Sequence, residues 1–149
     1  MEKAPGMRDS AVIMIPSDPR YLSLVRTATA TMGKIYGLSD SEQEDVKLAV
    51  DEACANVIKH AYIGDVTRKI VVKFKIAGGF EVVIEDNGIK ARPDVIAGRS
   101  LDDVRPGGLG IHLIKRAFDI YRFDEKKKNG NRLRLVRYRG TGNEGPDSR

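Results

Sequence analysis

The sequence predicts an α/β sandwich in which about three helices cover one face of a mixed, mostly antiparallel β-sheet. Apolar and polar residues alternate in several short segments, as in half-buried strands, and apolar residues recur at helical spacing in others. The expected order is one strand, two helices, two strands, a long loop, one helix and two strands. A chain of 149 residues fits one domain and leaves little room for two.

Composition excludes several classes of protein. Apolar residues make up 41% and charged residues 32% of the chain, which is typical of a globular domain and not of a disordered one. No apolar run approaches the roughly 20 residues of a membrane helix, and the N-terminus lacks the apolar core of a signal peptide. We therefore expect a cytoplasmic protein. The single cysteine, Cys54, excludes an internal disulfide and a cysteine-rich zinc site.

The first strand is expected at residues 11–15, a short β-rich run. Asp18 before Pro19 is typical of a helix N-cap followed by proline at the first helical position, and Gly37 is typical of a helix end. The apolar face of this first helix is expected to consist of Tyr21, Val25, Ala28, Met32 and Ile35.

The second helix is indicated by a capping-box pattern in which Ser41 and Glu44 satisfy each other's exposed backbone donors. An apolar stripe follows at Val46, Ala49, Val50, Ala53, Val57 and Ala61.

Two alternating strands are expected around residues 70–76 and 80–84, joined by a Gly-Gly hairpin turn. Residues 87–108 form a loop too long for a routine connection, which favours a functional role. A third helix is predicted at about residues 110–118. The last two strands, at about 121–125 and 132–138, flank a lysine-rich Asn-Gly turn. Residues 1–10 and 140–149 are expected to be tails around a domain at 11–139.

The net charge of +5 is concentrated near the C-terminus. Residues 122–139 contain eight basic and two acidic residues. Such a segment fits a nucleic acid, an acidic protein surface or a solvated strand edge. Because no stacking aromatics are grouped there, the solvated edge is favoured over direct nucleic-acid binding.

The most informative segment lies within the second helix. Glu52, Asn56 and His60 are spaced by four residues and so lie along one ridge, with Lys59 on the same side. An amide oxygen can ligate magnesium, a lysine can neutralise phosphate, and a carboxylate can accept a proton. Spacing alone favours a solvated helix flank over such a site.

Two other segments add to this pattern. Asp86 and Gly88 lie where a strand ends, and a carboxylate there suits the amino group of adenine. Gly107, Gly108 and Gly110 open the third helix, where backbone N–H groups and the helix dipole favour an anion.

In this order the three segments resemble the N, G1 and G2 boxes of the GHKL ATPase superfamily. The closest resemblance is to the anti-sigma-factor serine/threonine kinases, and it runs from about residue 12 to residue 138. The matching stretches are EACANVIKHAY, similar to the family's E-A-x-x-N-x-x-x-H-x-Y helix, and GGLGIHLIK, similar to its glycine-rich segment.

The resemblance implies the Bergerat ATP-binding fold, with ATP and Mg²⁺ bound between helices and sheet beneath a lid at residues 87–108. Asn56 would ligate magnesium, Glu52 would be the general base, and Asp86 would bind adenine. The remaining nucleotide contacts implied by position are Lys59, Gly88, Arg105, Gly107, Gly108, Leu109 and Gly110.

The chain also departs from the family pattern. The second glycine of D-x-G-x-G is absent after Gly88, and Ala91 stands where this branch usually has phenylalanine. These departures affect the adenine end of the expected site and not the magnesium end.

The resemblance further implies a partner-switching regulator. Such a protein sequesters a sigma factor and phosphorylates an anti-anti-sigma (STAS-domain) partner on serine. Arg26 on the first helix is expected to contact a partner, and relatives form homodimers. The alternative is a nucleotide-binding regulator that acts by sequestration alone.

Overall fold

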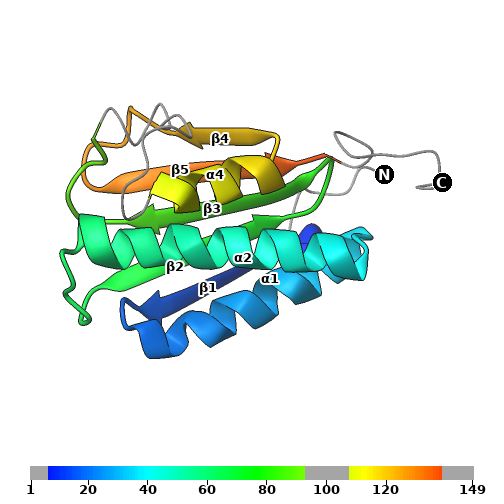
Figure 1. The fold of residues 1–149 in the computed structure, drawn as a ribbon, viewed down its shortest axis with the longest axis horizontal. Helices are drawn as coiled ribbons and strands as arrows, with labels where there is room; N and C mark the ends of the chain where they lie inside the picture. The colour runs from blue at the N-terminus through cyan, green and yellow to red at the C-terminus, as the bar shows by residue number, and fades with distance from the viewer. Residues whose placement is uncertain (1–6, 93–107, 139–149) are drawn as a thin grey trace.

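The computed structural model describes residues 7–92 and 108–138, and in it three helices pack against one face of a five-stranded sheet (Figure 1). The strands are β1 (Ser10–Pro16), β2 (Lys69–Lys75), β3 (Phe80–Asp86), β4 (Ile120–Phe123) and β5 (Asn131–Arg137). The helices are α1 (Leu22–Tyr36), α2 (Asp40–Asn56) and α4 (Gly108–Ala117), with short turns η1 (Met7–Asp9), η2 (Pro19–Tyr21) and η3 (Val57–Ala61).

The sheet has the order β1-β2-β3-β5-β4, and all four neighbouring pairs among these strands are antiparallel. Alternation is clearest in β3, whose even-numbered residues are buried from Phe80 to Asp86. This alternation follows from the period of two in a strand, with one face covered by helices and the other open. The expected α/β sandwich is confirmed.

The boundaries of α1 are close to those expected, but its buried face is not. Asp18 caps the η2 turn and Gly37 ends α1 at φ 112°, as the sequence predicted. Ile35, however, is 64% exposed, whereas Leu22 and Thr29 are buried. The buried stripe was misread because it contains a polar residue, Thr29, whose hydroxyl donates to the carbonyl of Val25 (2.7 Å).

The capping box of α2 is real, but the predicted residues were wrong. The N-cap is Ser39, whose hydroxyl accepts from the Glu42 N–H (3.1 Å), while the Ser39 N–H donates to the Glu42 carboxylate (2.8 Å). Two S-x-x-E patterns overlap here, and Ser41 lies inside the helix. The first pattern prevails because Leu38, directly before the cap, is buried in the core.

The end of α2 continues into η3, a π-helical turn. The N–H of Tyr62 bonds to the carbonyl of Val57, five residues earlier (2.9 Å). The extra residue in this turn leaves the Ala61 carbonyl to accept from the N–H of Ile89 (2.8 Å). The turn therefore joins α2 to the segment that follows β3.

The core lies between the helices and the sheet. Its fully buried side chains include Val25, Val46, Val50, Ile70, Val72, Phe74, Phe80, Val82, Ile84, Ile114 and Leu135. Cys54 lies in this core with no exposed surface, and burial raises the pKa of its thiol to about 12. No helix in residues 7–92 and 108–138 has the length and apolarity needed to cross a bilayer.

The open face of the sheet carries ion pairs that involve the basic C-terminal segment. Arg132 bonds to Glu85 (2.6 Å) and Asp124 (2.7 Å), and Arg134 lies 3.3 Å from Glu81. Acidic residues of β3 thus neutralise part of this charge, which agrees with a solvated sheet face.

Candidate functional site

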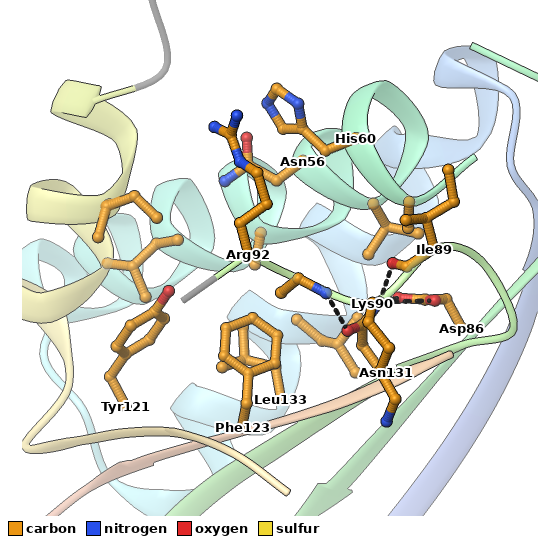
Figure 2. A pocket seen from close by; sticks show the side chains of 17 residues that line it. Asn56, His60, Asp86, Ile89, Lys90, Arg92, Tyr121, Phe123, Asn131 and Leu133 are labelled. Carbon is orange, nitrogen blue, oxygen red and sulfur yellow. Dashed lines mark hydrogen bonds between the residues drawn. The ribbon is translucent and has the colours of Figure 1, made fainter. Parts of the chain in front are cut away.

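A cavity of about 280 Å³ lies between the helices and the β3–β5–β4 edge of the sheet (Figure 2). Its walls come from segments that are far apart in the sequence. They are Ala53, Asn56, Val57, His60 and Ala61 from α2 and η3; Ile84, Asp86, Ile89, Lys90, Ala91 and Arg92 from β3 and the segment after it; Ile111 and Ile114 from α4; and Tyr121, Phe123, Asn131 and Leu133 from β4 and β5.

Asn56 supplies a polar atom for which the described residues offer no partner. Its Oδ1 is buried and accepts no hydrogen bond within the part of the chain that the structure describes. A buried acceptor of this kind calls for a ligand, and an amide oxygen is a suitable ligand for a hard cation. The described residues contain no cluster of three His, Cys, Asp or Glu side chains that could hold a metal. A cation at Asn56 would therefore depend on oxygens of a bound ligand.

Glu52 lies one helical turn before Asn56, beside the first turn of α4. A Cβ placed on Gly110 would lie 2.1 Å from Glu52 Oε2, so any larger residue there would displace this carboxylate from its observed position. Burial and the nearby Asp51 raise the pKa of Glu52, and Lys59 partly opposes the shift. A carboxylate with a raised pKa is a better proton acceptor than an exposed one.

Asp86 is the buried acid at the end of β3, with 4% of its surface exposed. Its Oδ1 accepts from the N–H of Gly88 (2.8 Å), and burial raises its pKa despite this bond. Gly88 packs against η3 so closely that a Cβ would lie 2.3 Å from the Ala61 carbonyl oxygen. Gly88 is thus needed for packing between backbone segments.

Asn131 is a site residue that the sequence reasoning missed. It is buried at the start of β5 and bonds to Asp86 through its amide nitrogen (3.0 and 3.2 Å). A signal was present, because Asn131 shares the inward face of its strand with Leu133 and Leu135. A polar residue in that series needs a partner.

The cavity floor is apolar and aromatic. Tyr121 and Phe123 meet edge to face, with ring centroids 5.8 Å apart, and Ile84 and Leu133 lie beside them. Burial raises the pKa of Tyr121 to about 12, so this ring is neutral at ordinary pH. Such a surface suits a flat heteroaromatic ring.

The other expected residues lie away from the cavity wall, at the start of α4 or outside the described residues. Lys59 is exposed and outside the cavity wall, although its charge acts on Glu52. Gly108 and Leu109 open α4, while Arg105 and Gly107 fall outside the described residues, as does most of the expected lid. Arg26 forms an ion pair with Asp51 on α2 (2.8 Å), so a partner at this place would meet an arginine already held by a carboxylate.

Comparisons with known proteins agree with this geometry. Residues 15–137 match the family model described as the histidine kinase-like ATPase domain. A serine-protein kinase RsbW of Listeria innocua is 34% identical over 76% of this chain and 78% of its own length. The serine-protein kinase RsbW of Bacillus subtilis is 28% identical over 76% of this chain and 77% of its own length.

One solved structure also has a similar fold. It contains the RsbU and RsbW domains of a Mycobacterium tuberculosis protein and aligns with a TM-score of 0.61 at 17% identity. The alignment covers 87% of this chain and 31% of that longer one.

Proposed function

Since this chain belongs to the histidine kinase-like ATPase family, in its branch of anti-sigma-factor serine kinases, we infer that it binds ATP in the cavity and phosphorylates a protein partner on serine. The observation that carries this inference is the position of Asn56 and Asp86 on the walls of one cavity. One end of that cavity suits a metal-bound phosphate and the other suits a purine.

The phosphate end would be built around Asn56. Its buried Oδ1, which accepts no hydrogen bond from the described residues, supports a role as a ligand of Mg²⁺, which would neutralise charge on the phosphates. The N-terminus of α4, with Gly108 and Gly110, would face the same phosphates with its backbone N–H groups. Lys59, exposed on η3, and Arg105 and Gly107, outside the described residues, are proposed as further phosphate contacts.

Glu52 would act as the general base. In the transfer, the serine hydroxyl oxygen forms a bond to the γ-phosphorus, the bond to the ADP oxygen breaks, and the hydroxyl proton passes to the Glu52 carboxylate. Burial supports this role, because it raises the pKa of Glu52 and so strengthens it as a base.

The adenine end of the cavity would be formed by Asp86 above the aromatic floor. Its buried carboxylate would accept a hydrogen bond from the amino group of adenine, while Tyr121 and Phe123 contact the ring. Gly88 would contribute by letting the backbone approach η3 and Asp86.

The chain acts as an anti-sigma factor that switches between a sigma factor and an anti-anti-sigma partner. Phosphoserine on the partner places about two negative charges at an interface, which weakens binding through repulsion and desolvation. Arg26 is proposed as part of the partner surface, and a homodimer is proposed as the working assembly. Residues 11–139 are proposed as the folded domain, which agrees with the family match over 15–137.

The decisive experiment incubates the purified chain with γ-labelled ATP, Mg²⁺ and a candidate STAS-domain protein, and measures phosphoserine. We expect transfer by the wild type and a loss of about 100-fold or more in Glu52→Gln, with ATP binding retained. Asn56→Ala should weaken ATP binding in the presence of Mg²⁺. Ser41→Ala, on the exposed side of α2, is the matched control and should behave as wild type.

Equal phosphoserine with wild type and Glu52→Gln would contradict the assigned base. Tight ATP binding without transfer to any partner would instead support the alternative, a regulator that acts by sequestration alone.

A further inference from the structure

Asn131 is a buried polar residue at the adenine end of the cavity. It is 7% exposed and is the first residue of β5, opposite Asp86 in the β3–β5 ladder. The family pattern described above assigns no role to this position, and the sequence places it directly after the Asn-Gly turn.

The side chain of Asn131 makes four hydrogen bonds (Figure 2). Its Nδ2 donates to both carboxylate oxygens of Asp86 (3.0 and 3.2 Å) and to the carbonyl of Ile89 (2.9 Å). Its Oδ1 accepts from the N–H of Ala91 (2.8 Å). One carboxamide thus connects β5, the acid at the end of β3, and the segment that forms the adjoining cavity wall.

These bonds determine the orientation of the amide. The reversed amide would set its oxygen against the Asp86 carboxylate and its N–H groups against the N–H of Ala91, so every contact would be repulsive. Both N–H groups of Asn131 are therefore committed to protein acceptors. The residue has no donor left for a ligand, and its effect on a ligand must pass through the groups that it holds.

Two of the four bonds hold the carboxylate of Asp86. With donors from Gly88 and Asn131 already bound, its remaining lone pairs can accept a hydrogen bond from a ligand in the cavity. A purine with an amino group at position six offers that donor. A purine with a carbonyl there would place an acceptor against an acceptor, and both would lose their hydrogen bonds to water.

Asn131 also holds the segment in which this chain departs from its family. Ile89 and Ala91 follow Gly88 without the second glycine of the usual motif, yet both are bound to the one carboxamide. The course of this segment is thus fixed from β5.

We propose that Asn131 is a positioning residue that determines which purine the cavity binds. It fixes Asp86 and residues 89–91 so that the cavity accepts 6-aminopurines and rejects 6-oxopurines. The inference rests on the proposed function, because it requires a nucleotide to occupy this cavity. Asn131 touches no reacting atom, and its contribution is made through Asp86.

The test compares the binding of ATP and inosine triphosphate by calorimetry, with Mg²⁺ present, to the wild type and to Asn131→Ala. We expect the wild type to bind ATP more tightly by about tenfold or more, the effect of one hydrogen bond to a charged group. In Asn131→Ala the carboxylate keeps the bond from the Gly88 N–H but loses both bonds from the Asn131 side chain, so its orientation is less constrained and the ratio of the two dissociation constants should fall at least severalfold. A residue that only stabilised the fold would weaken both nucleotides equally.

Two further variants make the test specific. Asn131→Leu places a branched side chain of similar length in the same buried position and removes all four bonds, so it leaves no cavity and tests the loss of selectivity even if the alanine variant does not fold. Arg132→Gln alters the next residue on β5, whose side chain pairs with Glu85 on the opposite face of the sheet. It should keep the wild-type ratio.

The outcomes separate the two proposals. A wild-type ratio in Asn131→Ala and Asn131→Leu would overturn the role of Asn131 and leave the proposed function intact. A wild-type chain that binds neither nucleotide would overturn both, because the cavity would then not be a nucleotide site.

Discussion

The absence of a side chain at Gly110 leaves room for the carboxylate of Glu52. The carboxylate of Glu52 fills the space that a side chain at position 110 would need, since a Cβ there would come within 2.1 Å of Oε2. A glycine near a phosphate site is usually explained by access for the ligand. Here the close approach of Gly110 to Glu52 gives a second reason, because a glycine leaves the proposed general base in its observed position.

We predict that Gly110→Ala reduces phosphoryl transfer by about ten- to a hundredfold, because a displaced base loses its alignment with the hydroxyl. The three close atoms all belong to the flexible Glu52 side chain, so the fold should tolerate the change. Alanine also favours helix by about 1 kcal/mol over glycine. The measurement is the rate of phosphoserine formation together with the thermal unfolding midpoint.

Leu113→Ala, at an exposed position of the same helix, is the matched control and should leave the transfer rate unchanged. A Gly110→Ala rate equal to that of wild type would show that Glu52 does not need its observed position.

The sequence predicted site residues that belong to spaced motifs and missed Asn131, which belongs to none. Glu52, Asn56 and Asp86 were predicted because their spacing and strand-end positions carry information along the chain. Asn131 lies 45 residues from Asp86, and its contact arises from the pairing of β3 with β5. Strand pairing between distant segments depends on tertiary packing, which local patterns do not contain.

Elements were predicted better than their exact ends, and α2 shows why. Both Ser39 and Ser41 precede a glutamate by three residues, so the local pattern permits two starts. The choice depends on burial of Leu38 and on Arg137 of β5, which lies 3.2 Å from Glu42. The π-helical turn η3 was likewise outside the reach of helical periodicity, since it is stabilised by Ile89 after β3.

We predict that Ser39→Ala lowers the free energy of unfolding by about 1 kcal/mol, the usual cost of losing an N-cap. Ser41→Ala, two residues further along, should change it by less than about 0.5 kcal/mol, since Ser41 is exposed within the first turn. Urea unfolding followed by circular dichroism measures both. A larger loss of stability in Ser41→Ala than in Ser39→Ala would instead support an N-cap at Ser41, as the sequence predicted.

At the scale of the whole molecule, stability should depend on pH through two carboxylates with opposite shifts. Bonds from the Ser39 backbone and Arg137 lower the pKa of Glu42, so its charge stabilises the folded chain above the unfolded pKa of about 4.3. That contribution is lost as the pH falls through the lowered value. Burial raises the pKa of Glu52, so its charge destabilises the fold at neutral pH, and this cost disappears on acidification.

We predict opposite effects for two isosteric variants. At pH 7, Glu42→Gln should melt a few degrees below wild type and Glu52→Gln a few degrees above it. The Glu52 difference should vanish first on acidification, because the pKa of Glu52 is raised, and the Glu42 difference should persist to lower pH, until the pH falls through the lowered pKa of Glu42. Calorimetric melting from pH 7 to pH 3 tests this, and two differences of the same sign would show that one of the shifts is misassigned.

The topology of the sheet explains why the cavity depends on the whole chain. Its walls come from α2, β3, α4 and the β4–β5 hairpin, and β5 pairs between β3 and β4. The site is therefore complete only after the last strand has been added beside β3. Partial folding of the N-terminal half would leave Asn56 and Asp86 without their opposite wall.

The reactivity of the buried thiol of Cys54 can report how often α2 separates from the core. Cys54 is the chain's single cysteine, it lies in the helix that carries Glu52 and Asn56, and no reagent can reach it while α2 is packed. Alkylation of the native protein therefore measures how often that helix separates from the core. A bound nucleotide that holds α2 and α4 together would slow this modification in proportion to its saturation.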